Sequence, residues 1–131
     1  MDRLTWRLQQ AARALASFKE LANIVAPSMI ERDAAIQRFE YTTEACWKAA
    51  QAVLFERFGV DAASPKAVIR AAAQNQLMTE ADARAAMGLI DDRNLTSRTY
   101  NEALAIALFA RLPEHARVFE RLLVGLEKSN A

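Results

Sequence analysis

The chain has 131 residues, of which 53% are apolar and 25% are charged, and its 17 basic and 16 acidic residues leave a formal net charge of +1. This length suits one domain with its own core, spanning residues 1–131, and the apolar share excludes a disordered chain. The charge balance lacks the large basic excess of a dedicated nucleic-acid-binding protein. There is no long uncharged apolar span, so we expect a cytoplasmic protein without membrane contact.

The single cysteine and the single histidine limit the chemistry that the chain can support. One cysteine excludes an internal disulfide, and Cys46 stands in an apolar run, so we expect a reduced core thiol. One cysteine and one histidine do not make a conventional zinc set. The sequence also lacks a glycine-rich phosphate loop and an Asp-x-Asp pair. We therefore expect no metal and no cofactor, and no nucleotidyltransferase activity from this chain by itself.

Two long amphipathic helices are predicted in the first half of the chain. Apolar residues recur three and four apart over residues 3–25, at Leu4, Leu8, Ala11, Leu15, Phe18, Ala22 and Val25. Pro27 ends this pattern, and Ser28 with Glu31 forms a Ser-x-x-Glu capping box that opens the second helix. A second stripe follows, and Gly59 after Phe58 is a plausible left-handed stop. This helix is the longest and most apolar, so we expect it at the centre of the fold.

Three further helices are predicted in the second half. Ser64 and Pro65 read as the N-cap and first residue of a short helix that reaches about Asn75. Thr79 caps the next helix, which runs through Ile90 into an unusual polar block. The last helix contains Pro113, which either kinks it or restarts it. No segment alternates like a strand, so the sequence predicts an all-α protein: an antiparallel up-and-down four-helix bundle with one additional short helix.

The polar block of residues 91–102 is the most informative part of the sequence. It contains Asp92, Arg93, Asn94, Arg98 and Tyr100. The two arginines are five residues apart, or about 140° around an ideal helix, so they converge only if the helix tightens or ends near Ser97. A guanidinium can hold a phosphate through two parallel hydrogen bonds, and a tyrosine hydroxyl beside cations is a reasonable acceptor for a nucleotidyl group.

Structural readings of the same residues stand beside these functional ones. Arg93 can neutralise a buried carboxylate on the second helix, with Glu40 or Glu44 as the candidates. Tyr100 can be an ordinary packed ring with a solvated hydroxyl, and Trp47 is expected in the core. His115 is 17 residues beyond Arg98, between Glu114 and Arg117. We expect it on the surface near a helix start, which leaves no general base close to Arg93.

The Arg-x4-Arg-x-Tyr pattern at Arg93, Arg98 and Tyr100 resembles the Arg-x4-His-x-Tyr signature of the nucleotidyltransferase substrate-binding protein family, which belongs to the HEPN group of helical bundles. Segments 32–48, 64–72 and 92–100 agree with that family in order and spacing. The resemblance implies an all-helical homodimer encoded beside a minimal nucleotidyltransferase. Some members are the RNase toxin of a toxin–antitoxin pair, in which the nucleotidyltransferase modifies the motif tyrosine with AMP.

Carried over by position, the resemblance makes Arg93 the motif arginine, Asn94 its polar neighbour and Tyr100 the modification acceptor. Arg93, Asn94 and Arg98 would bind nucleotide or RNA, with Glu40, Glu44 and Asp92 in supporting roles. Arg98 stands where the family has histidine, and arginine cannot shuttle protons at neutral pH. Binding can survive this change where cleavage does not.

The sequence thus favours a non-catalytic substrate-binding and regulatory subunit that partners a separate minimal nucleotidyltransferase and can belong to a toxin–antitoxin-like pair. The alternative is a HEPN-type metal-independent endoribonuclease, with Arg93 and Arg98 as its candidate catalytic residues. A third reading is a bundle used only for oligomerisation.

Overall fold

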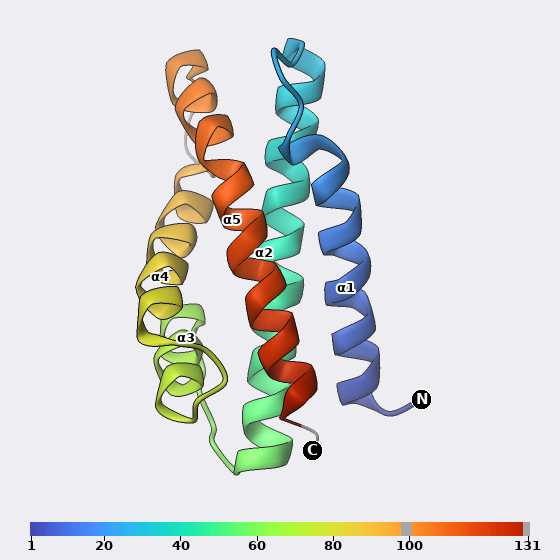
Figure 1. The fold of residues 1–131 in the computed structure, drawn as a ribbon, viewed down its shortest axis with the longest axis vertical. Coiled ribbons are helices and arrows are strands. Elements are labelled where there is room, and N and C mark those ends of the chain that lie inside the picture. The colour runs from blue at the N-terminus through green and yellow to red at the C-terminus, as the bar shows by residue number, and fades with distance from the viewer. Residues whose placement is uncertain (98–100, 130–131) are drawn as a thin grey trace.

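The computed structural model describes residues 1–97 and 101–129, and five helices account for most of them (Figure 1). They are α1 (Arg3–Ala22), α2 (Met29–Phe58), α3 (Pro65–Gln74), α4 (Glu80–Leu95) and α5 (Glu102–Lys128). In Figure 1 the long helices alternate in direction, with α1 and α4 running one way and α2 and α5 the other. The predicted all-α bundle with one short extra helix is confirmed.

The predicted helix starts and stops are found where the capping residues stand. The amide of Ser28 donates to Glu31 Oε1 at 2.8 Å and the amide of Glu31 donates to Ser28 Oγ at 3.0 Å, so the capping box opens α2. Gly59 ends α2 with φ 68°, a left-handed conformation that glycine adopts without strain. Ser64 and Thr79 accept hydrogen bonds from the third residue beyond them and cap α3 and α4.

The first helix ends earlier than its apolar stripe suggests. We predicted a helix over residues 3–25, but α1 ends at Ala22 and Val25 is exposed. Ala26 has φ 55° and precedes Pro27, and a residue before proline is disfavoured in the right-handed helical region. The chain therefore leaves the helix before this proline and turns into α2.

The core lies around α2, which packs against all four other helices. Phe18 of α1, Phe39 of α2 and Phe119 of α5 meet there, with ring centroids 6.0 to 6.2 Å apart. Cys46 is buried as predicted, and burial raises the pKa of its thiol. Trp47 is partly buried and packs on the same core. The central position predicted for the second helix is confirmed.

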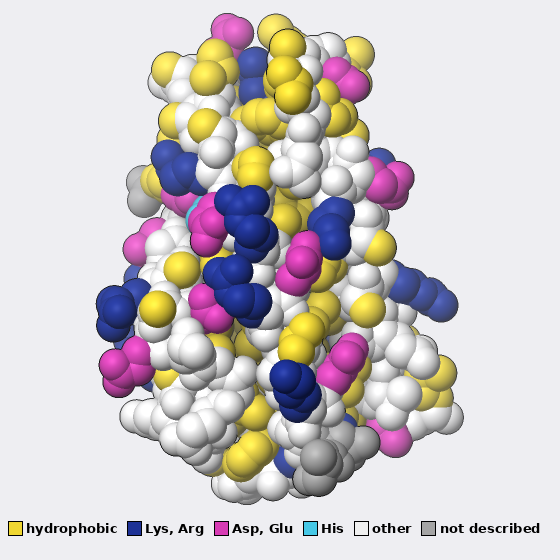
Figure 2. Space-filling model, in the orientation of Figure 1, with side chains coloured by type: hydrophobic (Ala, Val, Ile, Leu, Met, Phe, Trp, Pro, Cys, Tyr) yellow, Lys and Arg dark blue, Asp and Glu magenta, His cyan; other side chains and the backbone are white. Residues whose placement is uncertain are grey.

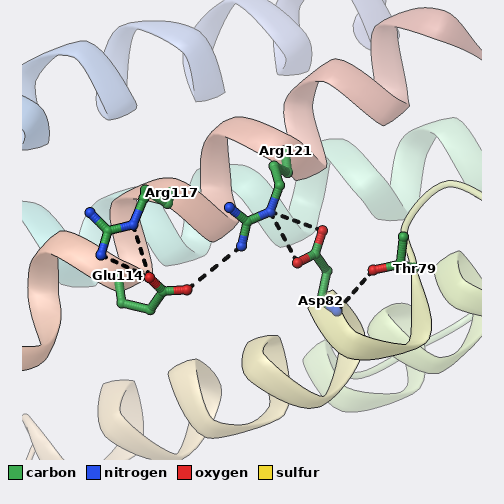
Figure 3. A network of polar contacts seen from close by, with 5 residues as sticks. All are labelled: Thr79, Asp82, Glu114, Arg117 and Arg121. Carbon is green, nitrogen blue, oxygen red and sulfur yellow. Dashed lines mark hydrogen bonds and ion pairs between the residues drawn. The ribbon is translucent and has the colours of Figure 1, made fainter.

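Two features join α5 to α4 and to the turn before it. A Cβ at Gly125 would lie 2.0 Å from the carbonyl oxygen of Leu77, so only glycine permits this approach. On the surface, Arg121 donates through Nε to Asp82 at 3.0 Å and lies 3.7 Å from Glu114 (Figure 3). These contacts fix the lower part of α5 against the start of α4.

The proline in the last helix does not divide it. Pro113 lies inside α5, which is continuous from Glu102 to Lys128, so of the two predicted alternatives the helix does not restart at this proline. None of the helices in the described part of the chain combines the length and apolarity needed to cross a membrane. Figure 2 shows basic and acidic side chains interspersed on the face that α5 occupies, in keeping with the near-neutral net charge.

Candidate functional site

The polar block begins on the last turn of α4. Arg93 and Asn94 are the third- and second-last residues of that helix. The hydroxyl of Thr96 donates to the Arg93 carbonyl at 2.6 Å and the hydroxyl of Ser97 donates to the Asn94 carbonyl at 2.8 Å. These side chains satisfy carbonyls that have no partner within the helix, so the sequence of the motif itself ends α4 here.

Two residues of the predicted site, Arg98 and Tyr100, lie outside the described residues. The convergence of Arg93, Arg98 and Tyr100 therefore stays a prediction from the sequence.

Arg93 reaches from α4 to α2. Its Nη2 is 3.8 Å from Glu44 Oε1, and Lys48 Nζ lies 3.9 Å from Glu44 Oε2. Of the two predicted partners Glu44 is therefore the one in contact, and no ion pair links Arg93 to Glu40 in the described part of the chain. The prediction that this carboxylate is buried is wrong, because the Glu44 side chain is 42% exposed.

The guanidinium of Arg93 keeps unused donor capacity. Its Nε is buried and finds no hydrogen-bond partner among residues 1–97 and 101–129. The contact of its Nη2 with Glu44 is too long for a hydrogen bond. A buried donor left without a partner is unfavourable, and an anionic ligand would satisfy it. Arg93 thus suits phosphate binding better than it suits a purely structural ion pair.

Asp92, which we assigned only a supporting role, is the best-connected polar residue of the region. It is 7% exposed. Arg111 of α5 donates to it twice, from Nε at 2.8 Å and from Nη2 at 2.9 Å, and His115 Nε2 lies 2.7 Å from its Oδ2. This cluster ties the end of α4 to α5 immediately beside Arg93.

The electrostatics of the cluster favour an ionised Asp92. Burial raises the pKa of this carboxyl, but the hydrogen bonds from Arg111 and His115 outweigh it and the pKa lies below its ordinary value. The hydrogen bond to Asp92 also raises the pKa of Arg111. An ionised carboxylate only accepts hydrogen bonds, so the proton between Asp92 and His115 is on Nε2 of the imidazole.

The surface position predicted for His115 is wrong. Its side chain is buried, and its ring stacks on Phe39 with centroids 5.2 Å apart and an interplanar angle of 17°. His115 is far from the motif in sequence but close to it in space, because α5 runs back along α4 and brings His115 to Asp92. The available signal was the spacing of Arg111 and His115, which are four residues apart and so share one face of α5.

A second arginine near the motif is buried with incomplete pairing. Arg32 on α2 is 9% exposed, and its Nη2 lies 3.6 Å from Glu102 at the start of α5. In the part of the chain that the structure describes, neither its Nε nor its Nη2 has a hydrogen-bond partner. Elsewhere on α4, Lys66 of α3 pairs with Asp91 at 2.6 Å. The end of α4 is thus held from α2, α3 and α5 together.

The arrangement can bind anions and hold an oriented imidazole, but the described residues include no group of three or more histidine, cysteine or carboxylate side chains placed to hold a metal ion. Arg93 and Asn94 offer donors at a helix end, and Asp92 orients His115 as a carboxylate orients a catalytic histidine.

Comparisons with known proteins agree on family and fold. The sequence model described as nucleotidyltransferase substrate binding protein like matches residues 6–128. A protein from Thermus thermophilus of known crystal structure is 57% identical, with 88% of this chain and 98% of that chain covered and a TM-score of 0.86. No curated protein gives a match.

Two more distant structures share the fold. A mutant of the MntA–HpeT toxin–antitoxin has a TM-score of 0.79 at 16% identity, with 95% of this chain and 97% of that chain covered. A tri-AMPylated HEPN toxin of Shewanella oneidensis, in complex with an MNT antitoxin, has a TM-score of 0.77 at 16% identity, with 98% and 99% covered.

Proposed function

Because this chain belongs to the nucleotidyltransferase substrate-binding protein family, we propose that it is a non-catalytic substrate-binding and regulatory subunit of a separate minimal nucleotidyltransferase. The observation that carries the proposal is the state of the motif. Arg93 lies at the end of α4 with a buried Nε that no described residue accepts from, while Arg98 replaces the residue that would move a proton. Such a motif can bind a phosphate group but lacks the proton-transfer residue needed to cleave a phosphodiester bond.

The distant structural relatives support a toxin–antitoxin-like setting. One of them is an AMPylated HEPN toxin in complex with an MNT antitoxin. By analogy with the family motif, Tyr100 is the residue of this chain that a nucleotidyltransferase would modify. Cations beside a tyrosine hydroxyl would stabilise the charge that develops on the transferred phosphate.

In this proposal the residues at the end of α4 have separate roles. Arg93, Asn94 and Arg98 bind the phosphate of a nucleotide, of RNA or of a substrate held by the partner. Asp92, with Arg111 and His115, holds the end of α4 in place, and Glu44 orients Arg93 until a ligand arrives. The binding face therefore rests on a rigid, hydrogen-bonded support.

A homodimer is part of the same proposal. The starts of α2 and α5 lie at one end of the bundle, and Figure 2 shows apolar side chains gathered there. Met29, Ile30 and Ile106 are among the exposed large apolar residues. A second copy would cover them, and light scattering coupled to gel filtration would measure the dimer.

Purified protein tested on single-stranded RNA separates binding from cleavage. The proposal expects binding without cleavage, and it expects Arg93→Ala to weaken the binding. RNA cleavage by the isolated chain that stops in Arg93→Ala would refute the non-catalytic assignment.

A second candidate function, a metal-independent endoribonuclease, is favoured by one observation. The Asp92–His115 pair places an oriented imidazole in the cluster beside Arg93, although the motif itself lacks histidine. For this candidate, His115→Gln should abolish RNA cleavage and relieve any toxicity on expression without the partner. A harmless wild-type chain that becomes toxic as Arg98→His would instead show a competent scaffold whose natural motif is disarmed.

A further inference from the structure

A hollow between α1 and α2 is lined in part by Lys48, which pairs with the same Glu44 that contacts Arg93 of the motif. It has a cavity volume of about 190 Å³ and is lined by Arg3 and Arg7 of α1, by Lys48, Gln51 and Phe55 of α2, and by two carboxylates, Glu56 and Asp61. This volume is below that of typical drug-sized pockets but is ample for a phosphate group. None of the described residues of the polar block 91–102 lines this hollow.

The charges around the hollow favour an anion. Arg3 and Arg7 are four residues apart, so they share one face of α1, and Lys48 adds a third cation from α2. Three cations therefore face two carboxylates. Within residues 1–97 and 101–129 no ion pair of 4.0 Å or less joins Arg3 or Arg7 to any carboxylate. Cations that converge without close partners repel one another, and a bound anion would relieve that repulsion.

Two of the lining side chains are held in place. The Arg7 guanidinium carbon lies 5.0 Å from the centroid of the Trp6 ring, within cation–π distance. Gln51 Nε2 donates to the Ala62 carbonyl at 2.8 Å, which fixes the chain after α2 against the wall of the hollow. The hollow is thus partly preorganised, which lowers the cost of binding.

An exposed aromatic ring completes the site. Phe55 is 62% exposed on α2, although a large apolar side chain is normally withdrawn from water. Proteins that bind single-stranded nucleic acid combine cations that contact the backbone with aromatic rings on which bases stack. Phe55 beside Arg3, Arg7 and Lys48 has this composition.

One acidic residue, Glu44, contacts both a cation of the hollow and a cation of the motif. Glu44 lies 3.8 Å from Arg93 and 3.9 Å from Lys48, so cations of the motif and of the hollow share a single carboxylate. A strand that displaces Glu44 would meet Arg93 on one side and Lys48 on the other.

We infer that the hollow between α1 and α2 is a second phosphate-binding subsite, which takes a phosphodiester of a single-stranded oligonucleotide with a base stacked on Phe55. The inference rests on the proposed function only in that the same strand would continue to Arg93. It narrows the ligand of the proposed function to a polynucleotide strand.

Fluorescence anisotropy with a labelled single-stranded RNA of roughly eight nucleotides tests the subsite. The variants are the double change Arg3→Gln with Arg7→Gln, and the single change Phe55→Ala. Arg13→Gln is the matched control, because Arg13 is exposed on the same helix but does not line the hollow. Circular dichroism of each variant confirms that the helices remain.

The double variant should bind about tenfold more weakly and should show a shallower salt dependence, since each lost phosphate contact lowers the slope. Phe55→Ala should weaken binding by about tenfold, in line with the loss of one stacked base. Equal losses in Arg13→Gln and the double variant would overturn the inference, as would wild-type binding that neither lining variant changes.

Arg93→Ala separates this inference from the proposed function. Loss of binding in the lining variants but not in Arg93→Ala would support the subsite and contradict phosphate binding by the motif. Loss only in Arg93→Ala would support the motif and overturn the subsite.

Discussion

Asp92→Asn is the substitution that most sharply tests how the site is held together. The side chains have nearly the same shape, so the change removes charge without opening a cavity. Asp92 accepts three charge-assisted hydrogen bonds, two from Arg111 and one from His115, at 2.7 to 2.9 Å. The variant turns one acceptor oxygen into a donor group that faces the same donors.

The expected loss of stability follows from these contacts. Hydrogen bonds to charged groups contribute about 1.5–3 kcal/mol each. The full sum does not apply, because the Arg111 side chain is 45% exposed and regains water, and the asparagine oxygen still accepts one hydrogen bond. We expect a loss of about 2–4 kcal/mol, since breaking one side of a buried pair costs about 3–5 kcal/mol. For a chain of this length that lowers Tm by roughly 10 °C.

The loss should depend on pH in a defined direction. The pKa of Asp92 is lower in the folded protein than its ordinary value of 3.8, so its stabilisation is fully present above that value. It disappears as the pH falls through the lower, folded pKa. The difference in unfolding free energy between wild type and Asp92→Asn should therefore be constant near neutrality and narrow below about pH 4.

Urea unfolding followed by far-UV circular dichroism measures this difference across pH. Asp91→Asn is the control, because the neighbouring Asp91 forms an exposed pair with Lys66 whose loss should cost under about 1 kcal/mol. Equal stability of wild type and Asp92→Asn at neutral pH would refute the reasoning. So would a difference that persists unchanged in acid.

Three other substitutions or reactions follow from the packing and the charges. Gly125→Ala should lower the stability of the fold by about 3 kcal/mol in thermal melts, because the new Cβ would clash with the Leu77 carbonyl. Gly88→Ala is the control: it has open space around it and should be neutral or stabilise the fold by about 1 kcal/mol. Equal effects of the two changes would contradict the structure. Arg93→Ala should change stability by less than about 1 kcal/mol, because its contact with Glu44 is long and its Nε has no described partner to lose. The same change should weaken RNA binding, and a large fall in Tm would make the role of Arg93 structural. Cys46 should resist iodoacetamide until urea unfolds the chain, since it is buried and its pKa is raised, and rapid labelling of the native protein would show an open core.

The helix boundaries that depend on neighbouring residues could be predicted from the sequence. The capping box of Ser28 and Glu31, the left-handed Gly59 and the caps at Ser64 and Thr79 are decided within about one helical turn, so local chemistry specifies them. Val25 shows the limit of such patterns. It continues the apolar stripe but lies outside α1, and the stripe carries no information about the restriction that Pro27 places on Ala26.

The pairing of the site residues could not be predicted in the same way. His115 meets Asp92 across 23 residues of sequence, because of how α5 packs on α4. A local rule sees a histidine between charged neighbours and places it at the surface. Arg93 was paired correctly with α2, but the choice of Glu44 over Glu40 depends on the height at which α4 crosses that helix. Such contacts are set by tertiary packing and not by spacing.

Co-expression with a minimal nucleotidyltransferase of the same genome, followed by affinity purification and intact mass spectrometry, tests the proposed function most directly. The proposal predicts that the two proteins purify together, that the chain gains nucleotidyl mass absent from Tyr100→Phe, and that the isolated chain leaves RNA intact. A chain that purifies without the partner, carries no adduct and by itself cleaves RNA in an Arg93-dependent manner would contradict it.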